Sequence, residues 1–292
     1  MPEAFYKYMP YSTAEIVLRN QTLRWTTPAT LNDPYDIQFD LRIDIDRELA
    51  LQLALDKLWK LINKQLEYNI DNPMHRLVPD LQRMYQGQPR DIFTQQMSGV
   101  IRESLAALDG SILKIREETR ALLSTVKILC LTDSPANQLM WAYYADSNKG
   151  AVLRFQNVPG AGSPYQMAKP MNYHNELPML FDEEGFSRLV SGLNRLDTKE
   201  IFNNLIYTKS NAWSHEREWR ICSGDGRDRK APHEDLPFGS RELTGVIFGC
   251  RMPAAERETL IEILEKSYPH TELLQATPAS HRYNLEISRI ER

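Results

Sequence analysis

The feature that most constrains the fold is a change in the spacing of apolar residues along the chain. From residue 47 to residue 125 they recur every three to four residues, the spacing of an amphipathic helix, as in RELALQLALDKLWKLI. On both sides of this block, short runs of β-branched and aromatic residues are separated by turns, which is typical of strands. Strands that surround a helical middle indicate an α+β protein.

We therefore expect a single α+β domain over residues 1–292, with a mixed or mainly antiparallel central sheet. Residues 47–125 would form a helical insertion or subdomain within it. Strict alternation in FDLRIDID, residues 39–46, predicts a half-buried strand. Ser12 and Glu15 match a capping box, which predicts that a helix begins at Ser12.

Composition excludes several classes of protein. The net charge is −4 and the isoelectric point is about 5.9, so no general positive field attracts nucleic acid or anionic lipid. The three cysteines are far apart in apolar runs, which does not suggest a disulfide framework. No signal segment and no apolar run of about 18 residues is present. We expect a cytoplasmic protein that does not contact membranes.

The first candidate site is KSNAWSHEREWRICSGDGR, residues 209–227. If it is a strand, Glu216, Glu218 and Arg220 share one face, with the two glutamates about 6–7 Å apart at the backbone. Such a pair can raise one carboxyl pKa, or place one group on a sugar hydroxyl and the other on a nucleophile. The alternative is an ordinary solvated face on which Arg220 neutralises its neighbours.

A second candidate is the aromatic cluster of Trp141, Tyr143 and Tyr144 in a short predicted helix. Aromatic rings stack on nucleobases or nicotinamide, and a tyrosine hydroxyl can orient a ligand. The alternative is a core helix that buries Trp141.

Two further candidates lie near the start of the chain. Lys7 and Tyr8 end a predicted strand just before a helix, whose N-terminus could receive an anion near Ser12. Asn32 and Asp33 belong to the turn LNDPYD and could hold a ligand. The alternatives are a solvated lysine and a side-chain-stabilised turn.

Several common motifs are absent from the sequence. It has no Gly-x-x-x-x-Gly-Lys phosphate loop, no Gly-x-Gly-x-x-Gly opening a helix, and no His-Glu-x-x-His. Its six histidines are scattered, so we expect no metal site.

Four motifs occur in an order that resembles a bacterial family, domain of unknown function 2971. They are FYKY, LNDPYD, LMWAYYADSNKGAVLRF and WSHEREWRI. The resemblance spans most of the chain, apart from much of the helical block. The family name implies no activity.

The same order more remotely resembles the ADP-ribosyltransferase superfamily. That resemblance implies that Lys7 and Tyr8 hold NAD, and that Tyr143 or Tyr144 stacks on nicotinamide. Glu218 would bond the ribose 2′-hydroxyl as the glycosidic bond ionises, and Glu216 would orient the acceptor. Lys7 departs from the pattern, because the superfamily often has histidine there.

We accordingly expect an NAD-consuming transferase or glycohydrolase, with a toxin or phage-defence effector as its setting. Its partner would be a small nucleotide; the acceptor, protein or nucleic acid, stays open, as does oligomer formation. One alternative is a non-catalytic nucleotide-binding or sensor module. Another is a metal-dependent nuclease, whose ion would be held by oxygens of Glu216, Glu218, Asp33 or Asp36.

Overall fold

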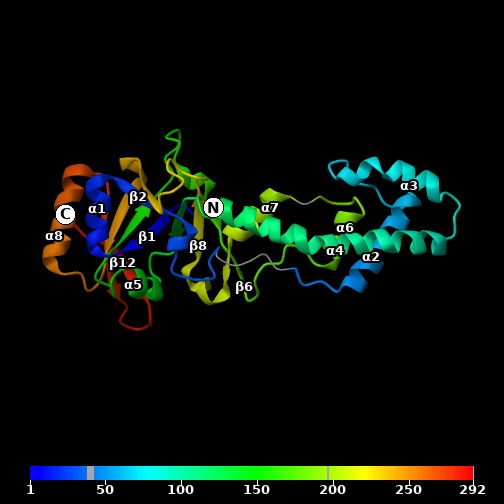
Figure 1. Cartoon of the computed structure of the whole chain (residues 1–292). Helices are drawn as coiled ribbons and strands as arrows, with labels where there is room; N and C mark the ends of the chain where they lie inside the picture. Colours follow the sequence, from blue (N-terminus) through cyan, green and yellow to red (C-terminus); the bar gives the residue numbers. More distant parts are fainter. Residues whose placement is uncertain (38–42, 196, 292) are drawn as a thin grey trace. The chain divides into compact units, whose positions relative to one another are not determined.

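The computed structural model describes residues 1–37, 43–195 and 197–291 (Figure 1). The chain divides into two compact units. The first, here called the sheet unit, comprises Met1–Gln38, Leu122–Glu176 and Tyr207–Arg292. The second, the helical unit, comprises Phe39–Ala121 and Leu177–Ile206. The expected α+β class is confirmed.

Among the described residues, one sheet of ten strands forms the centre of the sheet unit. Its main path runs β12-β11-β10-β4-β1-β3-β2-β9, with β8 on β3 and β5 on β8. The strands are β1 (Phe5–Met9), β2 (Thr22–Thr26), β3 (Ile128–Thr132), β4 (Ala151–Phe155), β5 (Lys169–Pro170), β8 (Glu218–Cys222), β9 (His233–Pro237), β10 (Leu243–Phe248), β11 (Glu272–Pro278) and β12 (Leu285–Arg289). Only β10 and β11 pair in parallel here, so the sheet is mainly antiparallel, as expected.

The sheet is split beside β3. Strand β8 pairs with β3 along its whole length. On the other edge, β1 meets β3 at Thr132 and β2 meets it at Ile128, the opposite end of the strand. Between these two points, this edge of β3 pairs with no other strand of the described residues. The edge is therefore open around Cys130.

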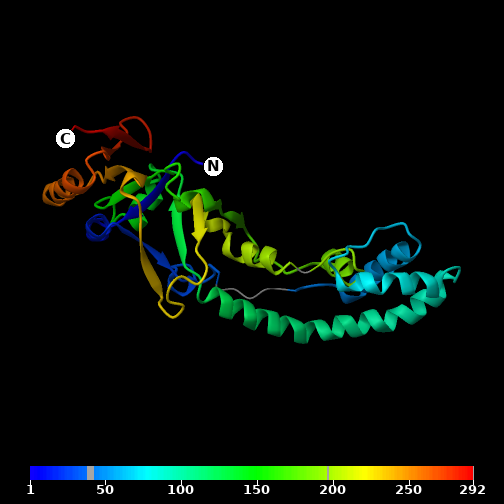
Figure 2. The ribbon, with the colours of Figure 1, turned by 90° about the horizontal axis from the view of Figure 1, so that it is seen from above.

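Helices cover both faces of this sheet (Figure 2). Helices α1 (Tyr11–Asn20) and α8 (Ala254–Ser267) pack on one face, where Leu18 and Leu264 join a core with Phe155. Helix α5 (Gln138–Tyr144) packs on the opposite face, where Trp141 meets Val152. Alternate residues of β4 thus enter different cores, because successive strand side chains point to opposite faces.

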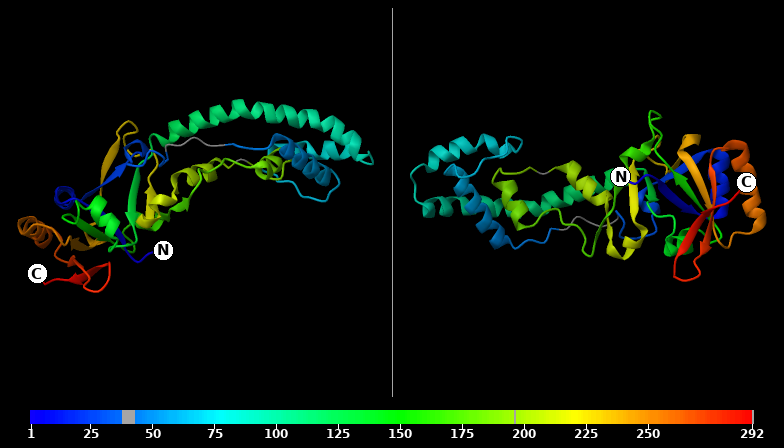
Figure 3. Two further views of the ribbon diagram at one scale, coloured as in Figure 1. Left: turned by 90° about the horizontal axis from the view of Figure 1, so that it is seen from below. Right: turned by 180° about the vertical axis from the view of Figure 1, so that it is seen from behind.

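The helical unit contains α2 (Arg47–Ile62), α3 (Val78–Tyr85), α6 (Glu183–Val190), α7 (Thr198–Ile206) and most of α4 (Arg90–Leu123) (Figure 3). Its core joins Leu58 of α2, Phe93 of α4 and Phe186 of α6. A two-stranded parallel sheet of β6 (Asn172–His174) and β7 (Thr208–Ser210) belongs to the sheet unit. Short 3₁₀ helices are η1 (Pro28–Thr30), η2 (Pro73–Arg76), η3 (Pro164–Met167), η4 (Asn211–Glu216) and η5 (Ser240–Glu242).

None of the helices found in the described residues combines the length and the apolar character that crossing a bilayer requires.

Two local predictions differ from the structure in the residues that it describes. Of the strand expected at 39–46, residues 39–42 lie outside the described residues, and residues 43–46 are irregular because Asp46 caps α2 by accepting from the amides of Glu48 and Leu49. Helix α1 begins at Tyr11 and not at Ser12, since its cap is Pro10 and no side chain caps it.

Candidate functional site

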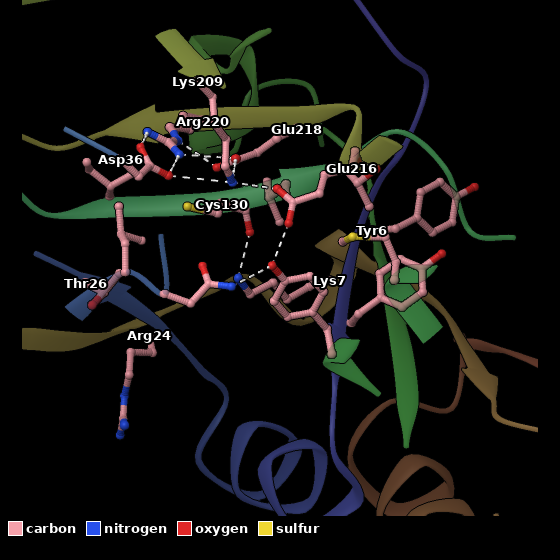
Figure 4. A pocket seen from close by; sticks show the side chains of 18 of the residues that line it. Tyr6, Lys7, Arg24, Thr26, Asp36, Cys130, Lys209, Glu216, Glu218 and Arg220 are labelled. Atoms are coloured by element: carbon pink, nitrogen blue, oxygen red, sulfur yellow. Dashed lines mark hydrogen bonds and ion pairs between the residues drawn. The ribbon is translucent and has the colours of Figure 1, made fainter. Parts of the chain in front are cut away.

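A cavity of about 270 Å³ lies in the sheet unit, beside the opening in β3 (Figure 4). Segments far apart in the sequence line it: β1, β2 and the turn after it, β3, α5, and residues 209–220. The side chain of Lys7 enters the opening, where its ammonium donates to the main-chain oxygen of Cys130 at 2.7 Å. The split in the sheet therefore forms part of the cavity wall.

Five charged side chains form one buried cluster on this wall: Asp36, Lys209, Glu216, Glu218 and Arg220. None of them is more than 6% exposed. The Lys209 ammonium lies 2.6 Å from Oε2 of Glu216, 2.8 Å from Oε2 of Glu218 and 3.6 Å from Oδ2 of Asp36. One ammonium thus meets three carboxylates.

Arg220 completes this buried cluster from β8. Its Nε donates to Oε1 of Glu218 at 2.6 Å, and its Nη1 donates to Oδ1 of Asp36 at 2.8 Å. The guanidinium is fully buried. These residues are therefore not solvated, although Arg220 does neutralise neighbouring carboxylates, as the alternative expected.

The backbone at the two glutamates differs from the expected strand. Residues 211–216 form η4, Arg217 has a left-handed backbone with φ of 48°, and β8 starts only at Glu218. Thr132 Oγ1 donates to the Glu216 main-chain oxygen at 2.7 Å, and the Glu218 amide donates to the Tyr173 hydroxyl at 2.8 Å. Glu216 therefore lies at the end of η4 and Glu218 at the start of β8, and their side chains meet at the Lys209 ammonium.

Burial and the neighbouring charges oppose one another at Glu218. Burial raises the pKa of its carboxyl, but Arg220 and Lys209 outweigh burial and hold that pKa well below its usual range. Burial lowers the pKa of the Lys209 ammonium, but Glu218, Glu216 and Asp36 raise it further than burial lowers it. Glu218 and Lys209 are therefore both charged at neutral pH, and Glu218 is not a proton donor there.

Two other polar side chains lie against the carboxylates. The Tyr144 hydroxyl donates to Oε1 of Glu216 at 2.5 Å and accepts from the Asn32 amide at 3.0 Å. Burial, and then Glu216, raise the pKa of Tyr144, so its phenol is neutral. Burial, and then Glu218, raise the pKa of the Cys130 thiol to about 12, which makes it a poor nucleophile.

The structure brings together most of the site residues predicted from the sequence. Those that line the cavity are Lys7, Tyr8, Asn32, Tyr144, Glu216 and Glu218. Tyr8 also donates its hydroxyl to the Ser134 main-chain oxygen at 2.8 Å.

Three of the predicted residues do not line it. Trp141 is fully buried in the core, where it contacts Tyr8 and donates its indole N–H to the Pro135 oxygen. Tyr143 is 67% exposed, on another side of α5. Asp33 is buried and accepts from the Tyr35 amide, so it stabilises the turn.

The nuclease alternative requires that the carboxylates of the buried cluster be available to a divalent ion. Asp36, Glu216 and Glu218 already contact the Lys209 ammonium, which a divalent ion would have to displace. The described residues contain no group of three or more His, Cys, Asp or Glu side chains suited to a metal ion.

Sequence reasoning did not assign Lys209 to the site, and it grouped Asp36 with Glu216 and Glu218 only as possible oxygen ligands of a metal ion. Asp36 and its partner Arg220 are 184 residues apart in the sequence, and nothing near either residue indicates the contact. The one local signal was that Lys209 opens the segment that also carries Glu216 and Glu218.

Residues 140–221 match the model of a family described as protein of unknown function (DUF2971). A search of curated proteins gave no match, and a search of solved structures gave none either. The matched segment includes Tyr144 and the four cluster residues from 209 to 220. The resemblance of this chain to the DUF2971 family, carried by residues 140–221, is therefore confirmed.

Proposed function

We propose that the sheet unit binds NAD and breaks the bond between nicotinamide and ribose, as a transferase or a glycohydrolase. The observation that carries this proposal is the convergence of β1, α5 and the two glutamates on one cavity. NAD consumption removes a central cofactor from a cell, so we also propose a toxin or phage-defence effector as the setting.

The charge of the cluster suits this reaction. As the bond between ribose C1′ and the nicotinamide nitrogen breaks, its electron pair leaves with nicotinamide and positive charge develops on the sugar. Water or an acceptor nucleophile then bonds to C1′ and loses its proton to solvent. Three carboxylates against two cations give the cluster a formal charge of −3 + 2 = −1. Fixed negative charge in a buried site stabilises such a transition state more than the ground state.

The two glutamates differ in what a substrate could reach. Both oxygens of Glu218 are engaged, by Arg220 and by Lys209. Oε1 of Glu216 accepts from the neutral Tyr144 hydroxyl, which a ribose hydroxyl can replace without separating an ion pair. Within this proposal Glu216 contacts the ribose and Glu218 acts through its charge, while Lys7, Tyr8 and Asn32 contact the rest of the nucleotide.

The test is to incubate the purified chain with NAD and a chelator and to measure released nicotinamide by chromatography. We expect release by the unaltered chain, and a rate about 10²–10³-fold lower for Glu216→Gln, the usual cost of one preorganised group. Glu242→Gln is the matched control, because Glu242 is a buried glutamate that does not line the cavity. It should keep full activity.

Calorimetric titration with NAD separates the remaining outcomes. Binding with no nicotinamide release would show a nucleotide-binding module and not an enzyme. The engaged oxygens of Glu218 favour this second candidate, because they leave no free carboxylate oxygen there for a substrate. Absence of both binding and release would overturn the proposal.

A further inference from the structure

Lys209 has no role yet in the proposed reaction, although its ammonium is the centre of the charged cluster (Figure 4). It lies in β7, which pairs with β6 so that Lys209 is opposite Tyr173. The Tyr173 hydroxyl in turn accepts from the Glu218 amide. The same two short strands therefore fix the positions of both the lysine and one of its carboxylates.

The two cations of the cluster contact different numbers of carboxylates. Arg220 contacts Glu218 and Asp36, whereas Lys209 contacts these two and also Glu216. Among the described residues, Lys209 is the cation that forms a salt bridge with Glu216. Glu216 is also the carboxylate whose other oxygen meets a neutral hydroxyl. The orientation of Glu216 therefore depends chiefly on Lys209.

The surroundings of Lys209 suit an ammonium. Its nitrogen lies 5.2 Å from the centre of the Trp213 ring and within 3.6 Å of an oxygen of each of the three carboxylates. An ammonium is compact and its three donors point in different directions, so it can serve several carboxylates at once. The fixed planar fork of a guanidinium serves one or two.

We propose that Lys209 is a positioning residue, which orients Glu216 and Glu218 toward the cavity and holds the two carboxylates side by side. This rests on the proposed function for its effect on the reaction, but not for its effect on the cluster. Without Lys209, three neighbouring buried carboxylates would face Arg220 alone. Repulsion would separate them or force one to take up a proton.

The activity test compares Lys209→Met with the unaltered chain in NAD cleavage. A displacement of about 1 Å at a reacting group can cost about 100-fold in rate, so we expect a loss of that size in kcat with little change in KM. The profile of kcat against pH should also shift upward, because one carboxylate now titrates at higher pH. In Lys209→Ala, added n-propylamine replaces the missing atoms and should restore part of the activity.

A second measurement does not use NAD. The free energy of unfolding of Lys209→Met is compared with that of the unaltered chain across pH. A carboxylate whose pKa is raised in the folded state binds its proton more tightly there than in the unfolded state, so folding is favoured as pH falls. The deficit of the variant should therefore be larger at alkaline than at acidic pH. The titratable or charged groups that face the ammonium are Asp36, Glu216, Glu218, Tyr144 and Tyr173, and Arg220 shares two of these carboxylates with it.

Lys127→Met is the matched control. Lys127 is a fully buried lysine of the same unit, and its ammonium donates to the Thr125 main-chain oxygen at 3.0 Å. Its deficit should not vary with pH. If Lys209→Met behaves like this control and keeps its kcat, the positioning role is refuted. If the pH signature appears but the unaltered chain releases no nicotinamide, Lys209 holds the cluster and it is the proposed function that fails.

Discussion

The buried charged cluster of the sheet unit differs from the surface pairs of the helical unit, which resemble other pairs of the sheet unit such as Arg24 with Asp235. In the helical unit, charged side chains pair at the surface: Arg102 and Glu48 are 2.9 Å apart, and both side chains are 57% exposed. In the sheet unit, Lys209 and Arg220 meet three buried carboxylates. Surface pairs contribute little to stability, whereas a buried pair has a desolvation cost that can exceed its attraction. Stability alone therefore does not explain the buried cluster, which lies on a cavity wall.

Arg220→Met should give the largest difference between the two regions. Its removal leaves the buried carboxylates of Glu218 and Asp36 without their guanidinium, which typically costs about 3–5 kcal/mol. Urea unfolding followed by tryptophan fluorescence measures the change. If the free energy of unfolding falls no more than it does when a surface pair is removed, the buried cluster and the surface pairs do not differ in their contribution to stability.

Acid should cost the cluster more stability than it costs the surface pairs. The pKa of Glu218 is lowered in the folded state from an ordinary value of 4.5, so its contribution is present above that value and is lost as pH falls below it toward the lowered pKa. We expect a loss on the order of 2 kcal/mol, measured as the free energy of unfolding between about pH 7 and pH 3. Glu218→Gln should lack this part of the acid dependence. An identical acid profile for variant and unaltered chain would show that Glu218 is not held in this way.

The smallest effect is expected in the helical unit. Arg102→Met removes an exposed partner of Glu48 and should change the free energy of unfolding by at most about 0.5 kcal/mol. The change should shrink further in salt, which screens exposed charges. A loss as large as that of Arg220→Met would mean that exposure does not separate the two kinds of pair.

Local patterns predicted much of the fold. Apolar and β-branched runs such as 151–155 and 243–248 are strands, and the helical spacing of 47–125 is borne out by α2, α3 and α4. The pattern missed β9, whose sequence HEDLP has few apolar residues and which is a strand because β2 offers it a paired edge. Packing of α6 against α2 joins segments more than a hundred residues apart, which periodicity cannot indicate.

The site was predictable to the extent that it is local. Helical spacing could have separated the exposed Tyr143 from Trp141 and Tyr144, which are three residues apart and lie on one side of α5. The left-handed backbone of Arg217 has no sequence signal, because non-glycine residues seldom adopt it. Asp36 joins the cluster through tertiary contacts alone, whereas Lys209 lies only 7 and 9 residues from Glu216 and Glu218.

The open edge of β3 has a consequence for how this cavity can change over time. The oxygen that meets Lys7 belongs to the peptide backbone at Cys130, so replacing the cysteine by another small residue would leave that acceptor in place. Side chains around the opening can therefore diversify while a hydrogen-bonding group persists at its centre. A lineage could acquire new ligand preferences here and keep the same anchor.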